Sequence, residues 1–443
     1  MAAPSSLRFG DRGQRIGLRL ITKVGSLPML GNPEVRRTVE SLLYRGSKGA
    51  FAAVEAASRR PFASRPGRGD PARTAPARPR REFDLTPSED QEELRLAAAR
   101  LADDIIRPAG ARADADRSVP EGVRRAAAEL GLHLVGVPSA LGGIAEERSA
   151  VTAALVVEEL ARGDLGIATA LLAPAAVATA LANYGSSAQQ ATYLPALTSG
   201  SPPARASLAL MEHGPLFDPL SPTTTATTRG SDLVINGAKS LVVGAAEADL
   251  LVISVLVDGV PRLVLVEAGT RGITVADDPA MGIRASTTGR IALDGVVVPA
   301  TNLLGTTDDH LDAVRRARLA WSAAACGTAQ AALDQLIPYV LTRQAFGEPI
   351  AHRQAVAFTV ADIAIELAGL RLVVWRAASR LDQGKDAARL IAHARQLTAT
   401  HAAQIGSHAV QLLGGHGFVK EFDNERWYRD LRGAGILEGV LLT

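Results

Sequence analysis

Residues 342–354 read TRQAFGEPIAHRQ, and three later stretches read QLLGGHGF (411–418), ERWYRD (425–430) and ILEGV (436–440). The first of these four stretches carries a chemical signal. Arg343, Phe346 and Gly347 combine a permanent cation, an aromatic ring and a residue that allows close approach. Such a set suits the diphosphate and the adenine of a dinucleotide.

Two further groups of residues in this region indicate chemistry. Gln411 is followed by the glycine pair Gly414 and Gly415, whose bare backbone can lie against a phosphate or a ring. Glu438 follows two apolar residues and directly precedes Gly439. A lone carboxylate among apolar neighbours becomes more basic when it is buried, as a general base for a weakly acidic C–H must be. Singly, each group also fits a plain helix end or a solvated glutamate.

The order and spacing of these groups are more specific than any one of them. RQAFG, Gln354, QLLGG and ILEG together resemble the C-terminal helical domain of the acyl-CoA dehydrogenases. Gln354 lies 11 residues after Arg343, and Glu438 lies 27 residues after Gln411, the intervals expected in that family. The resemblance extends over roughly residues 83 to 439.

Composition fits a large globular protein. The chain has 443 residues, 47% of them hydrophobic and 21% charged, enough for two or three domains with a sizeable core. No uninterrupted apolar run reaches the roughly 18 residues of a membrane span. The single cysteine, Cys326, allows no internal disulfide and no cysteine-based metal site, which fits a reducing compartment. We therefore expect a cytoplasmic protein, and the scattered histidines give no reason to expect a metal site.

Changes of pattern along the chain predict an α+β multidomain protein. Helical periodicity gives way to alternating, β-rich runs between Gly, Asp and Pro turns, and then returns. The predicted parts are a basic, partly helical extension (1–58), a Pro/Arg-rich linker (59–82), an N-terminal helical domain (83–203), a middle β-barrel or sandwich domain (204–305) and a C-terminal four-helix-bundle-like domain (306–443).

The N-terminal arm differs in charge from the rest of the chain. Residues 1–81 contain 17 Lys and Arg against 5 Asp and Glu, whereas the remainder contains 31 against 41. A basic arm on an acidic body allows peripheral contact with an anionic membrane. An arm that docks on its own body explains the charge equally well. Its aromatic residues are too scattered to indicate nucleic-acid binding.

The resemblance implies a noncovalent FAD between the middle and C-terminal domains. By analogy Arg343 pairs with the FAD diphosphate and Phe346 packs near the adenine. Gln411, Gly414 and Gly415 would line the diphosphate and ribose. Gln354 belongs to the same motif. A neighbouring subunit would reach the adenosine end, so the resemblance also implies a homotetramer, or a mixed tetramer with a homologue.

The same resemblance implies an acyl-CoA substrate and a reaction. Glu438 would remove the α-proton of the thioester while a β-hydride passes to the flavin, giving a trans-2-enoyl-CoA. Arg318 and Gly439 are the residues expected at the substrate. Some family members carry their base just before the arginine that matches Arg318; that position is Ala317 here, which leaves Glu438 as the candidate base. The expected electron acceptor is an electron-transfer flavoprotein.

The middle domain departs from the family pattern at the flavin. Where the family has T-E-P, this chain has Met211, Glu212 and His213, and where a threonine usually donates to the flavin, it has Val243. Backbone amides from Ala209 to Met211 could still bond the pyrimidine edge, although two side-chain hydroxyls are absent.

These losses keep other functions open. One is a noncatalytic partner subunit of a mixed oligomer. Others are an acyl-CoA oxidase or a flavin monooxygenase of the same fold; the monooxygenases usually lack the C-terminal glutamate that this chain retains. A binding or scaffold protein that uses the basic arm belongs to a different class.

Overall fold

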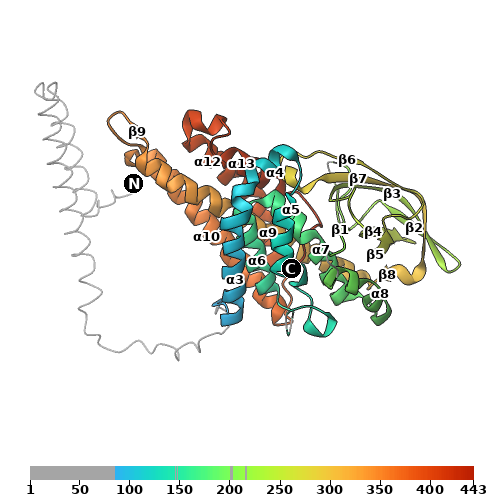
Figure 1. The fold of residues 1–443 in the computed structure, drawn as a ribbon. Helices are drawn as coiled ribbons and strands as arrows, with labels where there is room; N and C mark the ends of the chain where they lie inside the picture. The colour runs from blue at the N-terminus through green and yellow to red at the C-terminus, as the bar shows by residue number, and fades with distance from the viewer. Residues whose placement is uncertain (1–84, 145, 147, 200–202, 215–216) are drawn as a thin grey trace, which may run out of the picture. The chain divides into compact units, whose positions relative to one another are not determined.

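The computed structural model describes residues 85–144, 146, 148–199, 203–214 and 217–443. The chain divides into two compact units, residues 1–82 and 83–443. The predicted extension (1–58) and linker (59–82) therefore lie outside the described residues. Within the second unit, helices, then strands, then helices follow one another, as the α+β prediction requires (Figure 1).

The N-terminal part of the second unit is helical. Ser88 caps the first helix through a reciprocal capping box with Gln91, and Asp164 caps α7 through the amide of Ile167. The helices are α3 (Glu89–Leu101), α4 (Arg107–Asp116), α5 (Glu121–Glu129), α6 (Ala150–Gly163), α7 (Leu165–Tyr184) and α8 (Ser187–Thr198), with a π-helical turn (Ala102–Ile106) joining α3 to α4.

Helix α7 is long and apolar enough by composition to cross a membrane. Gly166, Thr169, Pro174 and Thr179 interrupt its apolar run, which is why the sequence showed no such stretch. In the structure 89% of the most apolar stretch of this helix is buried inside the protein. Its hydropathy is explained by its position, because a helix surrounded by protein needs no polar face.

The middle part is an eight-stranded sheet with the order β6-β7-β3-β2-β4-β5-β8, and β1 pairs with β4 in parallel. Its larger neighbouring pairs, β3 with β7 and β4 with β5, are antiparallel. The strands are β1 (Ala206–Ala209), β2 (Thr225–Arg229), β3 (Asp232–Val243), β4 (Leu250–Val257), β5 (Val260–Glu267), β6 (Ile273–Asp277), β7 (Thr288–Pro299) and β8 (Leu303–Leu304).

The C-terminal part is helical again and carries most of the motifs that the sequence singled out. The 36-residue helix α9 is buried along much of its length through alanines and small residues, which let α6 pack closely against it. The elements are α9 (Thr307–Thr342), β9 (Gln344–Ala345), β10 (Glu348–Pro349), α10 (Gln354–Asp382), α11 (Ala388–Leu397), α12 (Ala403–Leu412) and α13 (Asn424–Ala434).

Helix α13 ties the three parts together just before Glu438. The buried Asp430 carboxylate accepts a bond from the amide of Ile283, which lies between β6 and β7. Arg426 reaches the buried Asp164 at the start of α7, with Nε and Oδ2 2.9 Å apart. Burial, with the charge of Asp164 added, raises the pKa of Asp430 to about 7. The segment that carries Glu438 is thus fixed by contacts to both other parts.

A second buried ion pair lies inside the middle part. Lys239 Nζ of β3 is 2.6 Å from Oε1 of Glu212, and both side chains are buried. Burial raises the pKa of Glu212, but the Lys239 charge and the hydroxyls of Thr223 and Thr224 outweigh it and lower the pKa to about 2. Burial lowers the pKa of Lys239 to about 8 against the opposing effect of Glu212. The one family residue that survives in the altered MEH segment is therefore a structural partner.

We predict that Glu212→Gln lowers the free energy of unfolding by about 3 kcal/mol, because the change leaves a buried ammonium without its counter-ion. Chemical denaturation followed by circular dichroism measures the loss. In the native chain, this carboxylate stabilises the fold above its ordinary pKa of 4.5, and the contribution is lost as the pH falls from there toward 2. Glu267→Gln, at an exposed end of β5, is the matched control and should change stability by less than about 0.5 kcal/mol.

Candidate active site

Glu438 lies in the segment after α13, and two arginines hold its buried carboxylate. Arg318 of α9 donates from Nε to both carboxylate oxygens, at 3.0 and 3.1 Å. Arg395 of α11 donates from Nη2 to Oε1 at 3.0 Å. Arg395 also donates to the carbonyls of Ala434 and Leu437, so it holds the backbone as well as the side chain.

This arrangement corrects one expectation for Glu438. The sequence predicted a lone carboxylate in apolar surroundings, whereas the structure places two guanidinium groups on it. Burial lowers the pKa of Arg395 below its usual range, and the nearby Arg318 charge adds to this, while Glu438 opposes it. The apolar neighbours in the sequence misled because both arginines come from distant helices.

Gly439 and Val440 lie against the end of β1. A side chain at Gly439 would place its Cβ 2.9 Å from the carbonyl oxygen of Leu208, so only glycine fits there. The Val440 amide donates to that same oxygen at 3.1 Å. Trp321 of α9 donates from Nε1 to the Gly439 carbonyl at 2.9 Å. These contacts bring Glu438 and Gly439 beside the strand that carries Ala209.

The three residues predicted for the flavin ring lie at the ends of β1 and β3 and in the segment that follows β1. Ala209 ends β1 and Val243 ends β3, and both are buried. The hydroxyl of Ser207 donates to the Val243 carbonyl, and the amide of Ser240 donates to the Met211 carbonyl at 3.0 Å. The structure therefore groups Ala209, Met211 and Val243 near one another.

Arg343 and Phe346 belong to a hairpin that leaves the end of α9. Phe346 and Gly347 form its two-residue turn and both have positive φ, 56° and 84°, as in a type I′ turn. Phe346 is 95% exposed and contacts the guanidinium of Arg353, whose carbon lies 5.4 Å from the ring centroid. A left-handed phenylalanine at an exposed tip is strained and contributes nothing to the core. Arg343 is exposed at the base of this hairpin.

The second predicted diphosphate segment follows α12. Gln411, Gly414 and Gly415 are exposed, and Gly414 has a φ of 60°. No other atom lies within 4 Å of where a side chain would begin at either glycine, so the backbone is open to a ligand. The Tyr339 hydroxyl, one turn before Arg343, donates to the carbonyl of Leu413 at 3.0 Å. This bond places the glycine pair and the end of α9 at the same end of the helical domain.

The structure thus brings the predicted residues into two groups. Glu438, Gly439 and Arg318 adjoin the Ala209 strand, whereas Arg343, Phe346, Gln354, Gln411 and the glycine pair are exposed elsewhere on the helical domain. Sequence reasoning missed Arg395, Trp321 and Tyr339. Arg395 could have been noticed, since it lies four residues after the buried Ile391 on the inner face of α11.

Comparison with known proteins identifies the class of flavoprotein to which this fold belongs. Three family profiles match in order: "Acyl-CoA dehydrogenase, N-terminal domain" over residues 88–201, "middle domain" over 207–296 and "C-terminal domain" over 310–441. The chain belongs to the acyl-CoA dehydrogenase family and is an oxidoreductase that acts on CH–CH bonds.

Individual relatives of the chain differ in the activity that they are named for. It is 30% identical over 371 residues to the acryloyl-CoA reductase (NADH) of Anaerotignum propionicum, covering 82% of this chain and 93% of that one. It is 31% identical over 360 residues to the mitochondrial short-chain specific acyl-CoA dehydrogenase of Rattus norvegicus, covering 78% and 86%. Relatives of this chain in the family thus include both a reductase and a dehydrogenase of acyl-CoA thioesters by name.

Solved structures agree with the fold. Butyryl-CoA dehydrogenase from Megasphaera elsdenii has a TM-score of 0.73 at 25% identity, over 80% of this chain and 95% of that one. PigA, solved with FAD and proline, has the same TM-score at 26% identity and the same coverage. The family depends on FAD, and homologous structures contain it.

Arg395→Met tests the double ion pair. The change removes one guanidinium from a buried carboxylate and leaves two backbone carbonyls without their donor. We therefore expect the free energy of unfolding to fall by about 3 kcal/mol. Arg389→Met, at an exposed position of the same helix, should change it by less than about 0.5 kcal/mol. Equal stability of the two variants would show that Arg395 does not hold Glu438 in solution.

Proposed function

We propose that the chain binds FAD and oxidises an acyl-CoA thioester to the trans-2-enoyl-CoA, with Glu438 as the base. The observation that carries the proposal is the position of Glu438. It is buried, it is fixed by Arg318 and Arg395, and it adjoins the strand end where the flavin ring is expected. A carboxylate buried at that point fits proton abstraction, whereas a surface glutamate would not.

The residues present fit the adenosine diphosphate half of FAD. Arg343 offers an exposed guanidinium, and the open backbone at Gly414 and Gly415 offers a surface on which a diphosphate can lie. The exposed ring of Phe346 is free to stack on an adenine. These residues would hold the cofactor, which supplies the hydride acceptor when it is bound. Backbone amides near Ala209 and Met211 would meet its pyrimidine edge.

The chain's own part in the reaction is to hold the thioester and to move one proton. The α-C–H bond breaks, its proton passes to a carboxylate oxygen of Glu438, and the β-hydride leaves as the double bond forms. Arg318 and Arg395 fix the position of the carboxylate, so its conformational entropy is not lost during the reaction step. Oε2 accepts one bond, from Arg318 Nε, and a carboxylate oxygen has a second lone pair with which it can take the proton.

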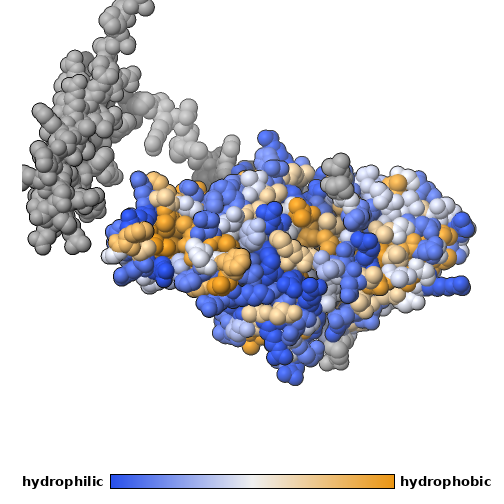
Figure 2. Space-filling view, turned by 90° about the horizontal axis from the view of Figure 1, so that it is seen from above, coloured by the Kyte–Doolittle hydropathy of each residue, from blue (hydrophilic) through white to orange (hydrophobic). Residues whose placement is uncertain are grey.

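A second copy of the chain would complete the FAD site. Phe346 and Phe418 are 95% and 94% exposed. The outer face of α10 exposes Phe358, Ile365 and Leu372, which are spaced seven residues apart, and Figure 2 shows apolar patches at the end of the molecule that carries this helix. An apolar helix face of this kind is typical of an interface. We propose a tetramer on this basis, which the mass of the particle in solution tests.

A noncatalytic partner subunit is the second candidate. The observation that favours it is the double ion pair, which engages the oxygens of the carboxylate that would act as base. Met211 and Val243 in place of hydroxyl donors point the same way. For the catalytic form we propose an electron-transfer flavoprotein as the acceptor, as the resemblance implies.

Glu438→Gln is the experiment that decides between the two. The amide keeps the side-chain volume but cannot take up a proton, so the variant should keep FAD and bind acyl-CoA. The rate of flavin reduction should fall by about 10²- to 10⁴-fold, the factor that a general base usually contributes. Anaerobic mixing with acyl-CoA and the loss of flavin absorbance measure this rate.

Glu421→Gln, at an exposed position after the glycine loop, is the control and should be reduced at the native rate. Equal rates for native protein and Glu438→Gln would place the base elsewhere. If the native protein binds FAD but no acyl-CoA reduces that FAD, the chain is a noncatalytic subunit.

The strained turn gives a separate test of the FAD site. Phe346→Gly relieves a left-handed backbone and should stabilise the chain slightly, by up to about 1 kcal/mol. It should nevertheless lower the amount of FAD that copurifies, because the aromatic surface is lost. Arg117→Gly, at another exposed residue with positive φ (51°), relieves the same strain and should leave the FAD content unchanged. Full FAD content in Phe346→Gly would refute the adenine contact.

A further inference from the structure

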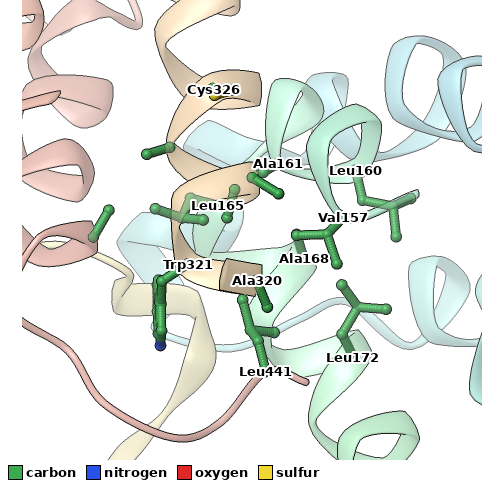
Figure 3. Close-up of a cluster of buried hydrophobic side chains, with 14 of the residues drawn as sticks. Val157, Leu160, Ala161, Leu165, Ala168, Leu172, Ala320, Trp321, Cys326 and Leu441 are labelled. Carbon is green, nitrogen blue, oxygen red and sulfur yellow. The ribbon is translucent and has the colours of Figure 1, made fainter. Parts of the chain in front are cut away.

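The segment that follows Glu438 is buried in the apolar core. Val440, Leu441 and Leu442 are 3%, 1% and 7% exposed. Leu441 lies among side chains of α6, α7 and α9, including Leu172 and Trp321 (Figure 3). Leu442 belongs to the neighbouring cluster between α7, the sheet and the first half of α9. The two leucines thus extend into the space between the N-terminal helices and α9.

Backbone contacts anchor this segment at both ends. Besides the bonds at Gly439 and Val440, Arg316 of α9 donates from Nη1 to the Thr443 carbonyl at 3.0 Å, and the Thr443 hydroxyl donates back to the Arg316 carbonyl at 3.3 Å. Between the anchors, the Leu441 amide donates to the Gly439 carbonyl at 2.8 Å across Val440, whose φ is 68°. Such a turn is strained for a β-branched residue. The strain persists because the flanking contacts impose it.

Little free space is left around the leucines. The hollow beside them has a volume of about 10 Å³, room for at most one water molecule. Its other walls come from α6, α7 and Val135, which lies between α5 and α6. They are apolar apart from one threonine: Val135, Ala153, Val156, Val157, Leu172, Ala175, Ala176 and Thr179. Alanines and valines leave room on the helix side, and the leucines fill it.

We infer that Leu441 and Leu442 are specificity-determining residues that restrict the substrate to short acyl chains. The inference rests on the proposed function. An acyl-CoA whose α-carbon meets Glu438 must send its remaining carbons into apolar space. The leucines stand only three and four residues from Glu438, within reach of an acyl chain that starts there. They occupy the apolar space that a long chain would need, whereas a chain of about four carbons leaves them in place.

Holoenzyme with Leu441→Ala and Leu442→Ala, singly and together, tests this. Binding of S-butyl-CoA and S-octyl-CoA, thioethers that cannot be oxidised as thioesters, is measured by calorimetry. Native protein should bind the octyl compound no more tightly than the butyl compound. In the double variant the affinity for the octyl compound should rise at least tenfold relative to the affinity for the butyl compound, and by up to about 200-fold if four methylenes become buried. Rates of flavin reduction by butyryl-CoA and octanoyl-CoA should shift in the same direction.

Leu194→Ala with Leu197→Ala, two leucines of α8 that are equally buried but do not line the hollow, is the matched control and should keep the native ratio. If the double variant does not fold, the single variants supply the measurement. A native protein that prefers the octyl compound, or folded variants with the native ratio, would overturn the inference. If no acyl-CoA reduces the flavin, the proposed function fails, yet the binding ratio still decides whether the leucines set the chain length.

Discussion

The carboxylate of Glu438 and the two guanidinium groups that hold it are the interaction on which the candidate site depends. A buried charge is tolerated only when it is paired and hydrogen-bonded. Arg318 and Arg395 supply that pairing from two different helices, and Arg395 also donates to two backbone carbonyls that precede Glu438. The helices α9 and α11 therefore fix the position of the carboxylate. Helix α13 fixes the point at which the segment that carries Glu438 leaves the helical domain.

That constraint passes to the rest of the site through the backbone. With Glu438 fixed, Gly439 meets the Leu208 carbonyl so closely that no side chain is possible, and the following residues enter the core. Strand β1 in turn pairs with β4 and contacts β3, which carries Val243. A displacement of the carboxylate would thus shift the contacts of the strand end at which the flavin ring is expected.

Much of the fold and part of the candidate site could be predicted from the sequence, for physical reasons. Helical and strand periods predicted the three-part fold, since each reports which side chains face a core, and the motif spacing indicated the family. The surroundings of Glu438 could not be read, because Ile436 and Leu437 suggested an apolar pocket while the arginines lie 120 and 43 residues away. The burial of Leu441 and Leu442 could likewise not be predicted, since two adjacent leucines in a segment without helical or strand alternation give no periodic signal.

The account's central claim is that Glu438 takes a proton from the α-carbon of a bound thioester. It is tested most directly with a 3-thiaacyl-CoA, in which sulfur replaces the β-carbon, so no β-hydride can leave while the α-proton remains removable. The holoenzyme and its Glu438→Gln variant are incubated with this compound in deuterated water, and deuterium at the α-carbon is followed by NMR. The account predicts exchange with the native protein and none above background with the variant. Exchange at equal rates, or a bound compound that never exchanges in the native protein, would contradict it.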